Sequence, residues 1–364
     1  MTAPITLDLS MDPGPLTAVL CDIESVSGNE TTLADAVEAA LRPLTHLTVE
    51  RDGDAVFART TSGRPERVVV AGHLDTVPTA DNLPCRVEGG RLYGCGTTDM
   101  KSGVAVALRL AASVTEPVRD VTWVFYDCEE VEAERNGLGR VARNHPDWLT
   151  ADFAVLMEPT NATVEGGCQG SLKAEVTIRG RRAHSARSWH GTNAIHAAGA
   201  VLDRLRAYQA AEVEIDGLVY REGMNAVGIS GGVAGNVIPD ECSVSVNYRF
   251  APSKSETEAY DVVRAVFHGF EVSLSDSSPG AMPGLSDPAA AAFVAAIGKK
   301  PLPKFGWTDV ARFSALGVPA VNYGPGDPNV AHTREEHVEI ALIAECEDRM
   351  RTWLTSAAPA SPQR

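Results

Sequence analysis

Short runs of apolar, mostly β-branched or aromatic residues recur in the first half of the chain, at residues 67–71 (RVVVA), 121–126 (VTWVFY) and 153–157 (FAVLM). Each run has the length of a strand and no polar alternation, which indicates a strand buried on both faces. A segment with helical spacing, residues 101–114, separates the first two runs. Buried strands that alternate with helices favour an α/β domain with a largely parallel sheet.

The pattern changes near residue 172. Residues 172–179 (LKAEVTIR) alternate apolar and polar side chains, as strands with one exposed face do. The elements that we expect after it are helices at 192–208 and 255–267 and strands at 227–230, 242–250 and 270–274. This β-α-β-β-α-β order predicts a ferredoxin-like α+β sandwich.

Patterns typical of the first domain return towards the C-terminus. We expect helices at residues 287–297, 308–316 and 335–354, and one strand at 319–323. A single strand cannot form a sheet, so we expect this strand to join the sheet of the first domain. The predicted layout is therefore a discontinuous α/β domain, residues 1–172 and 281–364, with a second domain inserted at residues 173–280. Residues 356–364, rich in Ala, Pro and Ser, are predicted to be disordered.

The charge balance excludes several classes of partner. Lys and Arg number 32 and Asp and Glu 48, which gives a net charge of −16, and so negative a surface repels nucleic acids and anionic membranes. No apolar stretch reaches the roughly 20 residues of a transmembrane helix, and residues 1–10 lack the basic residues of a signal peptide. The seven cysteines form no Cys-x-x-Cys pair, which predicts reduced thiols and a cytoplasmic protein.

A histidine directly follows the first apolar run, within residues 72–76 (GHLDT). Residues two apart in an extended chain share a face. Asp75 can therefore accept the second ring N–H of His73, as carboxylates beside metal-bound histidines do. A single His-x-Asp pair also arises by chance in a chain with nine histidines. Asp99 precedes the helix expected at residue 101, where it is either an N-cap or a carboxylate that bridges two cations.

Acidic residues follow the other two apolar runs. Glu129 and Glu130 come after the second run, Glu158 ends the third, and His332 follows the last predicted strand. In open α/β sheets, ligands bind at the carboxyl ends of the strands. Two histidines with carboxylates and no thiolate suit a pair of divalent ions, with Zn²⁺ as the leading choice. One of the adjacent glutamates would then bind metal and the other stay free as a base; a solvated acidic loop is the alternative.

Together and in this order, these motifs resemble the zinc-dependent amidohydrolases that include glutamate carboxypeptidase, acetylornithine deacetylase and succinyl-diaminopimelate desuccinylase. The matching segments are residues 72–78, 94–103 (GCGTTDMKSG), 129–130, 157–159 and 332, and, in the inserted domain, 180–184, 191–196, 236–239 and 247–250. Within the family the chain is similar to the desuccinylases of actinobacteria, including at residues 305–309 (FGWTD). The resemblance implies a zinc-peptidase-like α/β/α catalytic domain with an inserted ferredoxin-like dimerisation domain.

The resemblance also implies roles for the candidate residues. The ligands of one Zn²⁺ would be His73, Asp99 and Glu158, and those of the other Asp99, Glu130 and His332, with Asp99 as the bridge and Co²⁺ or Mn²⁺ as alternatives at one site. Glu129 would be the base, taking a proton from a bridging water and passing it to the leaving amine. Asp75 would accept the second ring N–H of His73 and so support its role as a ligand. His184 would reach the scissile carbonyl from the partner subunit of a homodimer. A cis peptide between Asp99 and Met100 is typical of the family.

The implied substrate is a small anionic N-acyl amino acid, N-succinyl-LL-2,6-diaminopimelate, whose hydrolysis serves diaminopimelate and lysine biosynthesis. Guanidinium groups match carboxylates in two places. The residues predicted to bind the substrate are Arg249, Asn236, Thr308, Arg187 and Arg312.

Two positions depart from the better-known desuccinylases: Arg187 stands where an aromatic residue is usual, and Trp307 replaces a small residue. An acetylornithine deacetylase-like enzyme or a dipeptidase or carboxypeptidase relative is therefore the alternative. A non-catalytic relative would have lost ligands or the base, whereas all five ligands and Glu129 are present here.

Overall fold

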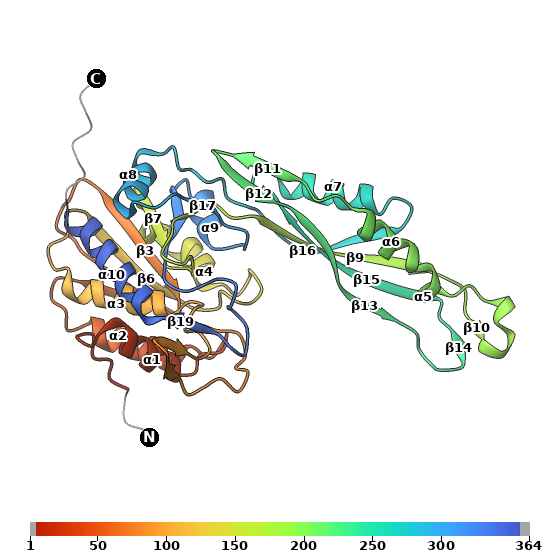
Figure 1. The fold of residues 1–364 in the computed structure, drawn as a ribbon, viewed down its shortest axis with the longest axis horizontal. Helices are drawn as coiled ribbons and strands as arrows, with labels where there is room; N and C mark the ends of the chain where they lie inside the picture. The colour runs from red at the N-terminus through yellow and green to blue at the C-terminus, as the bar shows by residue number, and fades with distance from the viewer. Residues whose placement is uncertain (1–4, 357–364) are drawn as a thin grey trace. The chain divides into compact units, whose positions relative to one another are not determined.

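Four parallel strands form the centre of the sheet in the first of two units (Figure 1). The computed structural model describes residues 5–356. The sheet order is β1-β2-β6-β3-β7-β18-β8-β17, with bounds Thr48–Asp52 (β1), Ala55–Arg59 (β2), Arg67–His73 (β3), Asp120–Tyr126 (β6), Phe153–Leu156 (β7), Glu165–Gly166 (β8), Leu302–Pro303 (β17) and Ala320–Asn322 (β18). β6, β3, β7 and β18 run parallel, which confirms the predicted α/β class. β1, β2 and β8 pair antiparallel and were not predicted.

Helices pack on this sheet and enclose an aromatic core. α3 (Lys101–Ser113) contacts β3, β6 and α10 (Ile340–Thr355). The other helices are α1 (Pro13–Asp22), α2 (Thr31–Leu41), α4 (Gly137–Asn144), α8 (Pro288–Ile297) and α9 (Val310–Ala315), with a short 3₁₀ helix at Pro146–Leu149. Phe153, Phe293 and Trp353 meet with ring centroids 4.8–6.1 Å apart, a separation at which aromatic pairs attract. The core fixes the strands whose ends carry the candidate ligands.

The helix predicted for residues 335–354 begins later than expected. Residues His337–Glu339 form a strand, β19, that pairs with β5 (Arg91–Tyr93), which in turn pairs with β4 (Arg86–Glu88). Val338 is buried between two half-buried neighbours, an alternation that suits a strand. Backbone pairing with the hairpin therefore overrides the helical pattern in this stretch, and α10 begins at Ile340.

The second unit contains a four-stranded antiparallel sheet in the order β13-β15-β9-β16. Its strands are β9 (Gly170–Arg179), β13 (Gly223–Gly231), β15 (Glu241–Phe250) and β16 (Glu271–Ser278), and its helices α5 (Ala194–Ala197), α6 (Gly199–Ala207) and α7 (Glu256–Val266). Alternate residues of β9 and β15 are buried, and Val244, Val263 and Phe267 belong to the core beneath the helices. The ferredoxin-like α+β order is confirmed.

Smaller elements of the second unit were not predicted. They are the pair β10 (Ala183–His184) and β14 (Val237–Ile238), the pair β11 (Glu212–Ile215) and β12 (Leu218–Arg221), and a 3₁₀ segment at Ser185–His190. By internal contacts, Gly167–Pro283 and Pro303–Ala311 form the second unit, and the other described residues form the first. The tail predicted to be disordered lies, from residue 357 on, outside the described residues. Among residues 5–356, no helix combines the length and apolarity that crossing a bilayer needs.

Candidate metal centre

The predicted ligands lie at the carboxyl ends of neighbouring parallel strands. His73 is the last residue of β3. Glu129 and Glu130 follow β6, and Glu158 follows β7. His332 lies in the loop between β18 and β19. Since β6, β3, β7 and β18 are parallel neighbours, their ends converge on one edge of the sheet.

Asp99 lies between the two histidines, just before α3. Its Oδ1 is 3.2 Å from Nε2 of His73, and its Oδ2 is 3.4 Å from Nε2 of His332. The Asp99–Met100 peptide is cis, as expected. The buried carboxylate of Glu336 accepts the backbone N–H groups of Thr98 and Asp99 at 3.0 and 3.1 Å. Each carboxylate oxygen of Asp99 thus faces a different histidine, an arrangement that suits a bridge between two cations.

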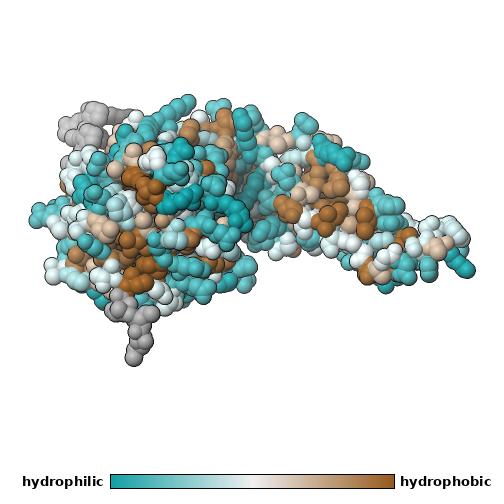
Figure 2. Space-filling view, turned by 60° about the horizontal axis from the view of Figure 1, so that its bottom comes forward, coloured by the Kyte–Doolittle hydropathy of each residue, from teal (hydrophilic) through white to brown (hydrophobic). Residues whose placement is uncertain are grey.

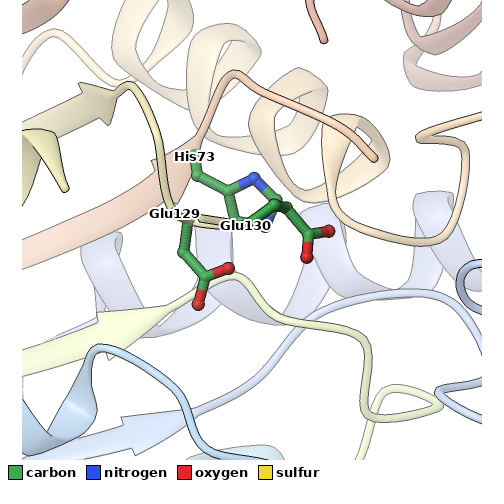
Figure 3. Close-up of side chains that lie close together, drawn as sticks. All are labelled: His73, Glu129 and Glu130. Carbon is green, nitrogen blue, oxygen red and sulfur yellow. The ribbon is translucent and has the colours of Figure 1, made fainter. Parts of the chain in front are cut away.

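Two groups of possible ligands share Asp99. One consists of His73, Asp99 and Glu158, and the other of Asp99, Glu130 and His332; within each group the ligand atoms lie within 4.8 Å of one another. A third group combines His73 with Glu129 and Glu130. Figure 3 shows the side chains of Glu129 and Glu130 diverging, with their carboxylates apart beside the imidazole of His73. Glu129 is therefore close to the cluster without belonging to either group that contains Asp99.

The carboxylates of the cluster favour positive charge on the groups beside them. Hydrogen bonds to Asp99 and Glu130 raise the pKa of His332 to about 11. Burial alone raises the pKa of Asp99, but the hydrogen bonds and charges of His332 and His73 outweigh it, so that the pKa is lowered. Cations bound among these groups would compensate the negative charge of the carboxylates around the two imidazoles. No cysteine belongs to these groups among the described residues, and imidazole nitrogens with carboxylate oxygens suit divalent ions such as Zn²⁺. The donor set thus fits two divalent cations that share Asp99.

Asp75 faces the second ring nitrogen of His73 with two of its oxygens. His73 Nδ1 lies 3.0 Å from the backbone oxygen of Asp75 and 3.4 Å from its carboxylate Oδ1. The fully buried carboxylate also accepts the backbone N–H groups of Glu129 and Glu130, each at 3.0 Å. Ser27 adds a hydroxyl hydrogen bond at 2.7 Å. Asp75 therefore contacts His73 with its backbone oxygen and its carboxylate, and it orients the two glutamates through its carboxylate.

The remaining candidates, apart from Arg312, lie in the second unit. His184 is exposed, and its Nδ1 accepts the N–H of Ala186 at 3.0 Å. Asn236 is close to it, because β10 pairs with β14 and the backbone oxygen of Asn236 accepts from Ser185 at 2.9 Å. Arg187 lies on the exposed 3₁₀ segment. The structure thus brings His184, Asn236 and Arg187 together on one loop region.

Arg249 lies elsewhere on the second unit, in β15 opposite Ser171 of β9. It is half-buried, burial lowers the pKa of its guanidinium, and no carboxylate among the described residues pairs with it. Thr308 is buried and its backbone oxygen contacts the thiol of Cys168. Arg312 belongs to α9 in the first unit, with its guanidinium beside Gly139 of α4.

Sequence reasoning missed two buried acids, Glu30 and Glu336. Both accept backbone N–H groups of loops that carry candidate ligands: Glu30 at Cys128, and Glu336 at Thr98 and Asp99. Burial raises the pKa of both carboxylates, that of Glu336 to about 7. In the sequence Glu30 is one more acid before a helix, and only the position of Glu336 four residues after His332 hints at a role.

Comparison with known proteins agrees with this geometry. The model of peptidase family M20/M25/M40 matches residues 69–356. The protein named "Putative succinyl-diaminopimelate desuccinylase DapE" of Mycobacterium tuberculosis is 56% identical over 351 residues, 96% of this chain and 99% of that one. The succinyl-diaminopimelate desuccinylase of Corynebacterium glutamicum is 48% identical over 360 residues, 96% of this chain and 98% of that one. The structure of Bacillus subtilis YXEP, described as a dinuclear metal-binding peptidase, superposes with a TM-score of 0.66 at 15% identity, over 93% of this chain and 95% of that one.

Proposed function

The chain belongs to peptidase family M20/M25/M40, and on that premise we propose that it hydrolyses the amide bond of N-succinyl-LL-2,6-diaminopimelate to succinate and LL-2,6-diaminopimelate. The observation that carries the proposal is the pair of ligand groups sharing Asp99, with Glu129 beside them. The desuccinylases of Mycobacterium tuberculosis and Corynebacterium glutamicum, similar over nearly the full chain, support the substrate. The reaction belongs to diaminopimelate and lysine biosynthesis.

We propose two Zn²⁺ ions as the native metals, with Co²⁺ or Mn²⁺ able to replace one. Bound there, the ions supply Lewis-acid chemistry, which polarises the amide carbonyl and makes a water molecule a nucleophile at neutral pH. His73 and Glu158 would hold one ion, Glu130 and His332 would hold the other, and Asp99 would contribute to both positions. His73 keeps its orientation because Nδ1 bonds to the backbone oxygen of Asp75.

Glu129 moves the proton in this proposal. Its carboxylate accepts a proton from the attacking water and then donates it to the nitrogen of the leaving amine. Asp75 fixes the backbone of Glu129. Glu129 belongs to neither of the two groups that contain Asp99, and its side chain points away from that of Glu130 (Figure 3).

The guanidinium group of Arg249 supports the proposal that the substrate is an anion. A half-buried guanidinium without a carboxylate partner among residues 5–356 is poorly compensated in the free protein, and a substrate carboxylate would pair with it in two places. Each succinylated diaminopimelate carries several carboxylates. Contacts of the substrate with Asn236, Thr308, Arg187 and Arg312 remain predictions.

A homodimer would complete the site. In the pair of strands β15 and β9, Arg249 lies opposite Ser171, and Glu241 lies opposite Arg179. These two positions are eight residues apart along the strand, which corresponds to about 26 Å. His184 follows Arg179 beyond that end. One small substrate therefore cannot contact both Arg249 and His184 of the same unit, which supports the prediction that His184 acts on the site of the partner.

The edge strand β13 offers a surface for this dimer. It lies at the border of the four-stranded sheet, and Val227 and Ile229 on it are 64% and 57% exposed. Val233 and Ile195 nearby are 67% and 41% exposed. Figure 2 shows apolar residues gathered on the second unit among hydrophilic ones. Exposed apolar groups on an unpaired edge favour pairing with a second copy.

We propose a cytoplasmic location. The seven cysteines are all free thiols, which supports this proposal because cytosolic thiols stay reduced.

Steady-state assays of the zinc-loaded protein on succinyl-diaminopimelate, acetylornithine and dipeptides test the proposed substrate. We expect kcat/KM to be highest for succinyl-diaminopimelate. A clear preference for acetylornithine or for a dipeptide would refute the substrate and favour the deacetylase-like or peptidase alternative.

A further inference from the structure

A buried acid that the proposed chemistry does not use contacts the loop that carries the base. Glu30 is 1% exposed and directly precedes α2, but its side chain makes no cap bond to that helix. Its Oε1 accepts the backbone N–H of Gly28 at 2.9 Å and that of Cys128 at 3.0 Å, and the thiol of Cys128 lies 3.4 Å away. Both hydrogen-bond donors of Cys128 thus point at one carboxylate oxygen.

Cys128 has an unusual backbone conformation. Its φ is +57°, in the left-handed region that residues with a Cβ seldom adopt. The next two N–H groups, those of Glu129 and Glu130, bond to the carboxylate of Asp75. Three successive backbone N–H groups therefore face two buried carboxylates. The left-handed residue turns the chain away from the line of β6 immediately before the two glutamates.

This turn decides where the two glutamate side chains go. Along an extended strand, adjacent side chains point to opposite faces of the sheet. After the turn at Cys128, both glutamates instead place a carboxylate oxygen within 4.8 Å of a ring nitrogen of His73 and of each other. Glu130 also reaches His332, with Oε1 2.7 Å from Nε2. A left-handed cysteine is unfavourable by itself, so a contact must hold it.

We propose that Glu30 is a positioning residue for the base Glu129, acting through Cys128, whose left-handed conformation it stabilises. The role of Glu129 as base rests on the proposed function, whereas the contact of Glu30 with Cys128 does not. Loss of Glu30 would let residue 128 return to a negative φ. The N–H groups of Glu129 and Glu130 would then leave Asp75, and the Glu129 carboxylate would spend less time where it accepts the proton.

A double-mutant cycle tests the proposal. We expect Glu30→Ala to lower kcat about tenfold or more, with a smaller change in KM. Glycine adopts φ near +57° without a Cβ penalty, so Cys128→Gly should keep most of the activity and should restore most of the loss in the Glu30→Ala background. Equal losses from Glu30→Ala in both backgrounds would overturn the proposal.

Asp120 provides a matched control at the other end of β6. Like Glu30 it is a buried carboxylate that accepts two backbone N–H groups, those of Ser62 at 2.8 Å and Arg64 at 2.9 Å. We expect Asp120→Ala to lower the melting temperature and to leave kcat near the wild-type value. If Asp120→Ala lowers kcat as much as Glu30→Ala does, the effect of Glu30 is general destabilisation and the proposal fails.

A measurement without substrate separates this proposal from the proposed function. Amide hydrogen exchange of the peptide containing residues 127–130 should be faster in Glu30→Ala than in wild type, and slower again once Cys128→Gly is added. Unchanged exchange in Glu30→Ala would overturn the proposal even for an active enzyme. If wild type fails to hydrolyse succinyl-diaminopimelate, the exchange result still decides the role of Glu30.

A second variant applies if Glu30→Ala does not fold. Cys128→Val leaves Glu30 in place but introduces a β-branched residue, which tolerates a positive φ poorly. We expect lower kcat and faster exchange in this peptide, with two metals still bound per chain. Wild-type kcat and exchange in Cys128→Val would contradict the importance of the left-handed residue and overturn the proposal.

Discussion

Replacing Glu129 by alanine should remove nearly all turnover and leave both metal positions filled. Glu129 belongs to neither of the two groups that share Asp99, so the change takes no ligand from them. Its backbone N–H, which bonds to Asp75 at 3.0 Å, is kept by alanine. The loss therefore falls on proton transfer. Such a group contributes about 10²–10⁴-fold to the rate, which corresponds to about 3–5 kcal/mol of the barrier.

The adjacent Glu130 is the matched control. It has the same side chain and the same backbone bond to Asp75 at 3.0 Å, but its Oε1 lies 2.7 Å from Nε2 of His332 within a group that contains Asp99. Glu130→Ala should therefore lose a metal ion as well as activity. The two substitutions are one position apart in the chain, and only Glu130→Ala should lower the metal content.

Metal analysis of the purified proteins after dialysis against Zn²⁺, together with kcat and KM for succinyl-diaminopimelate, distinguishes these effects. We expect two ions per chain in wild type and in Glu129→Ala, and fewer in Glu130→Ala. A Glu129→Ala protein that turns over substrate near the wild-type rate would refute the role of Glu129 as base. Loss of metal from Glu129→Ala equal to that from Glu130→Ala would refute the separation of base and ligand.

Three further predictions concern substrate, assembly and stability. Arg249→Ala should raise KM by about 10–100-fold, since a charge-assisted hydrogen bond contributes about 1.5–3 kcal/mol; kinetics with an unchanged KM would exclude the contact. His184→Ala should impair turnover while metal content and dimerisation persist, and mixing it with Glu129→Ala under exchange of subunits should restore about a quarter of wild-type activity, because half the dimers then hold one intact site; no recovery would contradict a shared site. Burial raises the pKa of Asp120, but hydrogen bonds from Ser62 and Arg64 outweigh burial, so the folded pKa is lowered. The stabilising contribution of this carboxylate is therefore complete above the unfolded pKa of about 3.9 and is lost as pH falls through the folded pKa. The difference in unfolding free energy between wild type and Asp120→Ala in urea should therefore shrink below about pH 4; a difference that grows with acid would reverse the sign.

The sequence was most informative where a strand ends in a polar residue. His73, Glu129 and Glu158 follow apolar runs that had to be buried strands, so their convergence in the structure follows from parallel pairing. Asp99 has no such signal: its place between His73 and His332 depends on the loop before α3, and only the family resemblance assigned it to both metals.

Other features depend on contacts that no local pattern records. Residues 337–339 continue the helical spacing of residues 340–354, yet they pair with β5 because the hairpin β4–β5 offers a free edge. Glu30 and Glu336 are recognisable only through the distant backbone N–H groups that they accept. Exposed loop residues such as Arg187 gave no structural signal of function, and its role stays a prediction.

Two cations that share Asp99 are the premise of the proposed hydrolysis, and an anomalous-scattering map of metal-loaded crystals tests them most directly. We predict two peaks, one within bonding distance of His73 and Glu158 and the other of Glu130 and His332, with a carboxylate oxygen of Asp99 on each. A map without an ion among these side chains, or with ions that leave Asp99 unligated, would contradict the proposed metal centre.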